Sequence, residues 1–128
     1  METKGKTIKA GRYGKAAPQF PEALKPFKAY LTAELPAPPA TVDDYSKVGN
    51  GNWPMDGNDH YGDCTIAAAA HALQCWNAVT AMQDQVPSEK AVVAQYLALT
   101  HGADNGLVES KVLKTWRTQG LWNNKIVA

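Results

Sequence analysis

The amino-acid sequence predicts a mainly α-helical fold, in which a three-helix subdomain follows an extended, proline-rich N-terminal arm. Apolar residues recur at helical spacing in three stretches after residue 63, whereas proline and glycine repeatedly interrupt residues 16–62. The chain has 128 residues, of which 45% are hydrophobic, and this suits one domain with a modest core.

The N-terminal part is predicted to be extended. Residues 1–15 form a basic tail in which five Lys or Arg residues are opposed by a single Glu. Such a charge run is typically solvated, and the alternative is an arm that docks on an acidic partner or on nucleic acid. Residues 16–56 form a Pro/Gly-rich extended arm, because six prolines between positions 16 and 40 exclude a long helix or a central strand. We expect this arm to pack across the core or across a neighbouring subunit, with a short turn at 41–46.

Residues 57–128 form the helical subdomain, with three predicted helices. They run from about Cys64 to Thr80, from about Ser88 to Thr100 and from about Leu107 to Gln119. Each has apolar residues at the period of a helix, and the inward-facing sets are Ile66, Ala69, Ala70, Leu73 and Trp76; Val92, Val93, Tyr96, Leu97 and Leu99; and Val108, Val112, Leu113 and Trp116. Ser88 is the expected N-cap of the second helix, and residues 125–128 resemble the beginning of a strand.

Charge and hydropathy exclude several classes of protein. The net charge is +1, so we expect nucleic-acid binding only through the basic tail. No apolar run is long enough to span a bilayer, and no membrane partner is expected. Residues 1–10 lack the apolar core of a secretory signal, which predicts that the protein is not secreted by that route.

The two cysteines, Cys64 and Cys75, are predicted to lie on one helix. Their spacing of eleven residues corresponds to about 16 Å along a helix, whereas a disulfide needs Cα atoms within roughly 7 Å. An intramolecular disulfide is therefore excluded, which favours a reducing compartment. Cys75 lies in the helix interior and is interpreted as core packing.

Cys64 is the leading candidate for chemistry, because it follows a glycine-punctuated loop and begins a helix. Asp63 is the expected N-cap, with its side chain accepting from amides of the first turn. The helix N-terminus lowers the pKa of a thiol, while the adjacent carboxylate opposes this by repelling a thiolate. The Cys64 amide and the side chain of Asn58 are candidate donors to an oxyanion. A small core cysteine without reactivity is the alternative interpretation.

The chain offers three histidines as a base for Cys64. His60, in the preceding loop, is the candidate that could fold back toward the thiol, and an exposed loop histidine is the alternative. His71 lies two helical turns from Cys64, about 10 Å away, and is expected to be a surface or packing residue. A base at His101 with Asp104 nearby is left open.

The polar residues of the same loop do not predict a metal site. The EF-hand pattern fails, because Tyr61 stands where glycine is required and Ala67 where the closing Glu belongs. His60 and Cys64 supply two ligands, fewer than a structural zinc site requires. We expect neither a metal nor an organic cofactor.

The sequence around Cys64 resembles the nucleophile motif of papain-like cysteine peptidases. Asn58 is followed by four residues, then by Asp63, Cys64 and small residues, a pattern most similar to the bacteriocin-processing branch. The later residues look like the sequence of uncharacterised bacterial and phage members, at Tyr96, Thr100, Asp104 to Gly106, Leu113, Trp116-Arg117, Gly120 and Lys125-Ile126. The resemblance covers roughly residues 50–128 and implies the helical half of a papain-like fold, with Cys64 at the start of its central helix.

Two departures from the family pattern shape the functional hypothesis. The family has Gln at the oxyanion position, where this chain has Asn58, and its catalytic His comes from a β-rich second half that nothing here matches. We therefore favour a truncated or degenerate papain-like domain with a structural or interaction role, such as a phage particle component, located in the cytoplasm or a virion. Its partner would be another protein or a further copy of the chain, bound through residues 1–56. The alternative is a cysteine peptidase that cleaves a polypeptide with Cys64, completed by a histidine from a missing segment or a partner chain.

Overall fold

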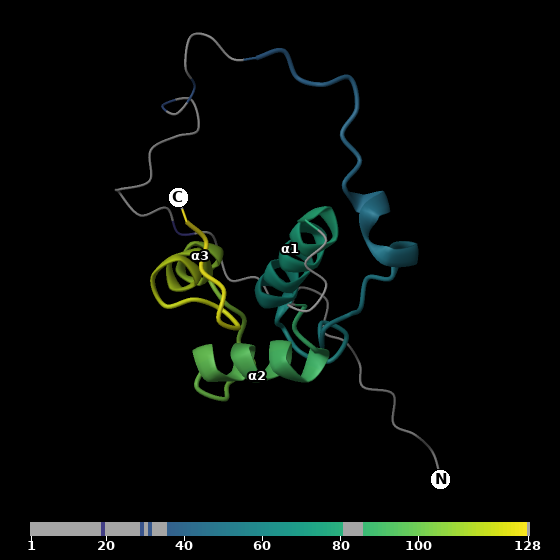
Figure 1. The fold of residues 1–128 in the computed structure, drawn as a ribbon. Helices are drawn as coiled ribbons and strands as arrows, with labels where there is room; N and C mark the ends of the chain where they lie inside the picture. Colours follow the sequence, from purple (N-terminus) through teal and green to yellow (C-terminus); the bar gives the residue numbers. More distant parts are fainter. Residues whose placement is uncertain (1–18, 20–28, 30, 32–35, 81–85, 128) are drawn as a thin grey trace.

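The computed structural model describes residues 19, 29, 31, 36–80 and 86–127. Its helices are α1 (Cys64–Thr80), α2 (Glu89–Leu99) and α3 (Glu109–Thr118), preceded by the 3-10 turns η2 (Tyr45–Lys47) and η3 (Gly49–Gly51). The described residues contain no strand, and an isolated bridge joins Leu121 to Asn124. The mainly α-helical class and the three predicted helices are therefore confirmed (Figure 1).

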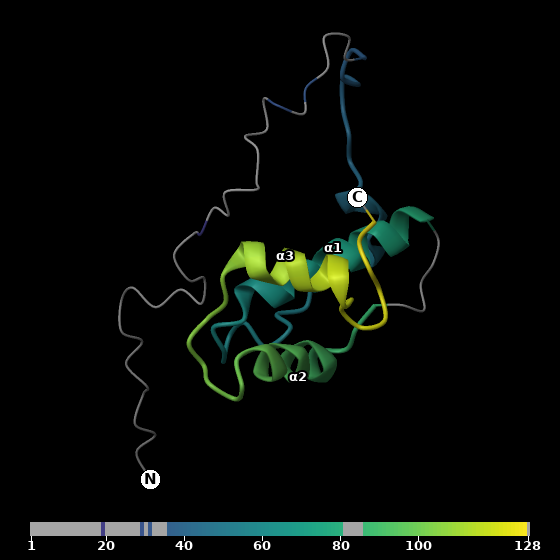
Figure 2. The same cartoon turned by 90° about the vertical axis from the view of Figure 1, so that its left-hand side faces the viewer.

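The three helices pack around one apolar core. Figures 1 and 2 show α1 and α3 side by side, with α2 crossing beneath both. The core is built from every helix and from the segment after α3, and it comprises Ile66, Ala69, Ala70, Leu73, Val92, Tyr96, Val112, Trp116 and Leu121. Most of these residues belong to the predicted apolar stripes, so the helical periodicity identified the buried face of each helix.

Local chemistry explains where the helices begin and end. The bounds of α1 are those predicted. Ser88 caps α2 as expected, because its side-chain oxygen accepts from the Ala91 amide at 3.4 Å. α3 begins at Glu109 rather than Leu107, because Val108 is extended, with φ −81° and ψ 122°. The expected strand does not form over the described residues 125–127.

Two residues of the predicted apolar stripes are not buried. Trp76 of α1 is 49% exposed and Leu113 of α3 is 47% exposed. The Trp76 ring stacks on the Trp116 ring with centroids 5.6 Å apart, so one face is covered by α3 while the remainder faces solvent. The prediction that both side chains are buried is wrong, because both line a groove between α1 and α3 that leaves them about half exposed.

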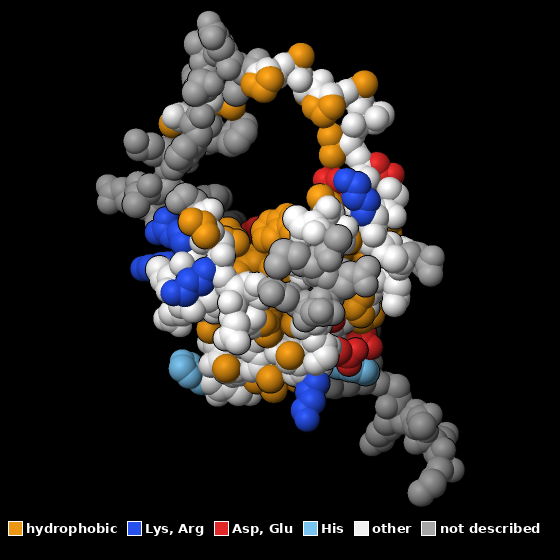
Figure 3. Space-filling model, in the orientation of Figure 1, with side chains coloured by type: hydrophobic (Ala, Val, Ile, Leu, Met, Phe, Trp, Pro, Cys, Tyr) orange, Lys and Arg blue, Asp and Glu red, His pale blue; other side chains and the backbone are white. Residues whose placement is uncertain are grey.

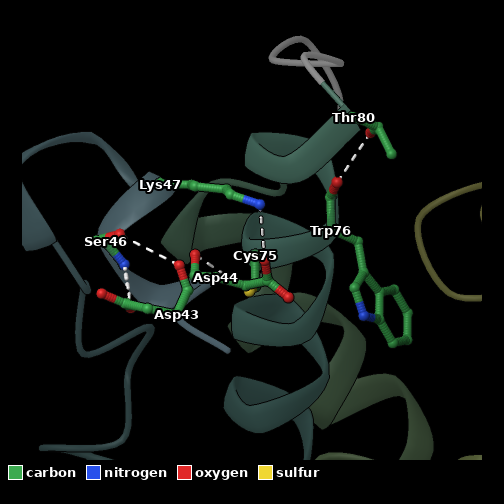
Figure 4. A network of polar contacts seen from close by, with 7 residues as sticks. All are labelled: Asp43, Asp44, Ser46, Lys47, Cys75, Trp76 and Thr80. Atoms are coloured by element: carbon green, nitrogen blue, oxygen red, sulfur yellow. Dashed lines mark hydrogen bonds and ion pairs between the residues drawn. The ribbon is translucent and has the colours of Figure 1, made fainter. Parts of the chain in front are cut away.

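The arm meets the helical subdomain at two described places. The Ser110 hydroxyl of α3 donates to the Gln19 carbonyl at 3.0 Å. Near the expected turn at 41–46, the Ser46 amide donates to Asp43 Oδ1 at 3.0 Å, and the Lys47 ammonium pairs with Asp44 at 2.8 Å (Figure 4). The Cys75 thiol donates to the Asp44 carbonyl at 3.9 Å, so this thiol packs against η2. The predicted basic tail, residues 1–15, lies outside the described residues.

Within the described ranges, each helix is too short or too polar to cross a bilayer. This finding agrees with the sequence, in which no apolar stretch reaches the length of a membrane span.

Candidate active site

The loop before Cys64 is a series of tight turns that ends in the first turn of α1. Gly57 has φ +91°, a left-handed conformation, and its carbonyl accepts from the amides of His60 and Tyr61 at 2.9 Å each. The Asp63 carbonyl then accepts from the amides of Ile66 and Ala67 at 2.8 and 3.0 Å. Cys64 is therefore the first residue of α1, as predicted, and its side chain is partly buried.

Three side chains attach this loop to the helical subdomain. From α1, Gln74 Nε2 donates to the Asn52 carbonyl at 2.9 Å, and His71 Nε2 lies 2.8 Å from the Pro54 carbonyl. From the segment after α2, Asp104 Oδ1 accepts from the Gly62 amide at 2.8 Å. Both ends of the loop are thus attached to elements that carry the core.

Asp63 does not cap α1 with its side chain, and that prediction is wrong. Its carboxylate is completely buried, and within the described part of the chain neither oxygen has a hydrogen-bond partner in another residue. Burial raises its pKa to about 6, with a smaller contribution from the nearby carboxylates of Asp56, Asp104 and Asp59, and its own backbone amide opposes the shift. The side chain is directed toward Gly57, since a Cβ built there would lie 3.0 Å from Asp63 Oδ2.

A raised pKa at Asp63 changes its expected effect on Cys64. A carboxyl with a pKa of about 6 is neutral in most molecules below that pH, so its repulsion of a neighbouring thiolate is then removed. Above that pH the charge returns and opposes the helix N-terminus, which favours the thiolate. The charge of Asp63 beside Cys64 therefore depends on pH, with its change centred at about 6.

The remaining predicted site residues lie on the outer side of the loop. Asn58 is exposed, and its backbone amide donates to the Met55 carbonyl at 2.9 Å. The His60 side chain is 76% exposed, and its Nε2 lies 3.3 Å from Asp59 Oδ2. The roles proposed for these residues, oxyanion donor and base, stay predictions.

The other two histidines are His71, which packs in α1, and His101, which is exposed. His71 matches the expected packing role, because its ring contacts Trp53 edge-on and its Nε2 lies 3.4 Å from the buried Asp56 carboxylate. Desolvation raises the pKa of Asp56, and the proximity of His71 lowers it in part. His101 is exposed in the turn after α2, with φ 54°, while Asp104 accepts from Gly62 and Tyr96.

Cys64 opens onto an apolar groove between α1 and α3. The groove encloses about 380 Å³, and one wall is the row Cys64, Ala68, Ala72 and Trp76, spaced four residues apart along α1. The facing wall comes from α3 and includes Val112, Leu113 and Trp116. Hydrophobic side chains gather over this part of the surface in the space-filling view (Figure 3). We missed the groove at the sequence level, although the four-residue spacing of small residues from Cys64 was the available signal.

The described residues around Cys64 are not arranged as a set of metal ligands. Among the described residues, no group of three or more His, Cys, Asp or Glu side chains is arranged to hold a metal ion. The Cys64 thiol is thus partly buried, stands at the N-terminus of α1 and lines the apolar groove.

The sequence matches no family model, and neither curated proteins nor solved structures show a significant similarity to it.

Proposed function

We propose that this chain is the nucleophile-bearing helical half of a papain-like thiol hydrolase, with Cys64 as the nucleophile. One observation carries the proposal: Cys64 begins α1 and also lines the groove between α1 and α3. The first position supplies the helix N-terminus that favours a thiolate, and the second supplies a place for the substrate next to the sulfur. The residue pattern from Asn58 to Cys64, which resembles the papain-like motif, supports the same assignment.

The reaction is acyl transfer from a polypeptide to the thiol. The Cys64 sulfur attacks the peptide carbonyl carbon, a C–S bond forms, and the carbonyl oxygen becomes an oxyanion that the Cys64 amide and Asn58 would stabilise. The C–N bond then breaks, and the leaving amine takes a proton from an imidazole. Water hydrolyses the thioester and regenerates the thiol. This imidazole would come from a partner chain or a missing segment, because His60 and His101 are exposed and His71 Nε2 lies 2.8 Å from the Pro54 carbonyl.

The test is the pH dependence of alkylation at Cys64. Iodoacetamide labelling is measured by mass spectrometry from pH 5 to 10 in the Cys75→Ala protein, with Cys64→Ala as the control for unspecific reaction. We expect a midpoint of about 7 or lower, since thiols at helix N-termini have depressed pKa values. A midpoint at about 8.5, the ordinary value for cysteine, would reject the proposal.

A second measurement tests the groove as the substrate site. Ala68 is exposed and lines the groove, so Ala68→Leu fills space next to Cys64 without entering the core. We expect this variant to slow labelling by an aromatic iodoacetamide several-fold while leaving labelling by iodoacetamide itself nearly unchanged. Ala98→Leu, on an exposed position of α2, is the matched control. Equal labelling of all three proteins by the aromatic reagent would show that ligands do not enter the groove.

A second candidate function is a protein-interaction role, and the exposed apolar surface at the end of the groove favours it. Trp76 and Leu113 are each about half exposed there. Exposed apolar surface of this kind commonly marks protein-binding sites. In this proposal the papain-like domain is degenerate and joins an assembly, such as a phage particle, through this surface and residues 1–56. Sedimentation of the parent and of Trp76→Ser should then differ in the fraction that self-associates. Monomers in both samples would reject self-assembly through this surface.

A further inference from the structure

We propose that Tyr96 and Asp104 are positioning residues for Cys64, acting through the backbone of Gly62. The inference rests on the proposed function of Cys64 as a reactive thiol and adds two residues to it. The observation that carries it is a hydrogen-bond chain connecting α2, the segment after α2 and the loop that leads into α1.

The hydrogen bonds are continuous and meet at one carboxylate oxygen, Asp104 Oδ1. Tyr96 Oη donates to Asp104 Oδ1 at 2.7 Å, and the same oxygen accepts from the Gly62 amide at 2.8 Å. The Gly106 amide donates to Tyr96 Oη at 3.0 Å, which fixes the segment that carries Asp104. Tyr96 is completely buried, so this series of hydrogen bonds begins in the core of the helical subdomain. The Tyr61 and Tyr96 rings also contact each other, with centroids 6.4 Å apart.

This series of hydrogen bonds ends at Gly62, two residues before Cys64. Gly62 directly precedes Asp63, whose buried side chain has no hydrogen-bond partner in another described residue to hold the backbone there. The Asp63 carbonyl starts the helical hydrogen bonds of α1, so the position of Gly62 determines where the helix begins. Displacement of Gly62 would move the Cys64 thiol relative to the N-terminus of α1, whose dipole favours a thiolate.

Tyr96 and Asp104 can be tested separately, because one substitution removes a hydrogen bond without changing charge and the other removes a charge while keeping the hydrogen bonds. Tyr96→Phe removes one hydroxyl and leaves every charge in place, so any change at Cys64 arises from position. Asp104→Asn keeps an oxygen that can accept from both Gly62 and Tyr96, but it removes a negative charge near Asp63. Trp122→Phe is the matched control. It also deletes one hydrogen bond, from Trp122 Nε1 to the Ala91 carbonyl at 3.2 Å, at the opposite end of α2.

The experiment measures iodoacetamide labelling of Cys64 against pH in the Cys75→Ala background, with unfolding by urea measured in parallel. For Tyr96→Phe we expect labelling at pH 7 to slow by about twofold, which is the change that a rise of about half a pKa unit gives for a thiol that titrates near 7. For Asp104→Asn we expect a rate at least equal to the parent's. For Trp122→Phe we expect reduced stability with unchanged labelling. A purely structural role for Tyr96 would reduce stability and leave the labelling profile unchanged, and that result would overturn the proposal.

The outcome is separable from that of the proposed function. If the parent thiol titrates near 8.5, the hydrolase assignment fails, whereas the difference between parent and Tyr96→Phe still measures positioning. If the parent titrates near 7 and both variants match it, the positioning role fails and the hydrolase assignment remains. Slower labelling in Asp104→Asn than in Tyr96→Phe would also contradict the proposal, because the amide retains the hydrogen bonds.

Discussion

Replacing Asp63 by Asn should make the protein more stable at neutral pH and leave it nearly unchanged in acid. The substitution preserves the shape of the side chain and removes its charge. Asp63 is completely buried, and its carboxylate has no hydrogen-bond partner in another described residue. A buried charge without a partner destabilises the folded state, whereas the protonated carboxyl does so much less.

The magnitude follows from the shift in pKa. Burial raises the pKa of Asp63 from 3.8 to about 6 in the folded protein. A shift of that size corresponds to about 3 kcal/mol at 1.36 kcal/mol per unit. Because the folded pKa is the higher one, the stability associated with the protonated form is fully present below pH 3.8. It is lost as pH rises through about 6. The amide side chain of the variant does not titrate, so the difference between the two proteins should grow by about 3 kcal/mol from pH 3.5 to pH 7.5.

The assay is urea denaturation at several pH values between 3.5 and 8, followed by tryptophan fluorescence. The quantity compared is the free energy of unfolding of the variant minus that of the parent, plotted against pH. The burial of the new amide adds a constant to this difference and cancels from its slope. Asp59→Asn, on the same loop but with an exposed side chain, is the matched control. A difference for Asp63→Asn that stays flat over the whole range would refute the conclusion that Asp63 is destabilised by burial.

Three further predictions test the surroundings of the site. Gly57→Ala should lower the free energy of unfolding by about 2 kcal/mol or more, because φ is +91° and the new Cβ would overlap Val93 Cγ2. Gly102→Ala, with φ +79° and open space around it, should cost only about 1 kcal/mol in the same urea titration, and equal costs would contradict the clash. Trp116→Ala should cost about 3 kcal/mol or more and half-exposed Trp76→Ala much less, so a reversed order in thermal unfolding would contradict the packing between α1 and α3. Burial and the hydrogen bond to Asp104 raise the pKa of Tyr96 to about 12. An alkaline absorbance titration of Tyr96→Phe should therefore lack the phenol that ionises near pH 12 in the parent. If the variant instead lacks a phenol that ionises near pH 10, the raised pKa of Tyr96 is contradicted.

The features that could be predicted from the sequence are those that depend on residues close together in the chain. The bounds of α1 follow from a glycine-broken loop next to a periodic apolar stripe, and the cap at Ser88 follows from its own side chain. The prediction that the Asp63 side chain caps α1 failed because it rested on neighbouring residues alone. Capping preference is local, whereas burial of this residue depends on packing against segments distant in the sequence, including the one that carries Asp104.

The groove and the Tyr96–Asp104–Gly62 chain depend on tertiary structure and could not be placed from sequence. Gly62 and Asp104 are 42 residues apart, and no pattern of spacing connects them. Periodicity assigned Trp76 to the apolar face of α1, but it does not specify how far along that face a neighbouring helix extends. The exposure of Trp76, at one end of the apolar face of α1, therefore depends on how α2 and α3 pack and cannot be predicted from periodicity.

Hydrogen bonds to the backbone of the loop offset the cost of the buried charge of Asp63 at neutral pH. That charge costs about 3 kcal/mol, the value of its shift in pKa. The hydrogen bonds that the loop backbone forms with Gln74, His71 and Asp104 contribute about 1 kcal/mol each, so together they offset a cost of this size. They reach the loop on both sides of Gly57 and join it to α1 and to the segment after α2. Ionisation of Asp63 should therefore change the charge beside Cys64 while the thiol remains at the start of α1.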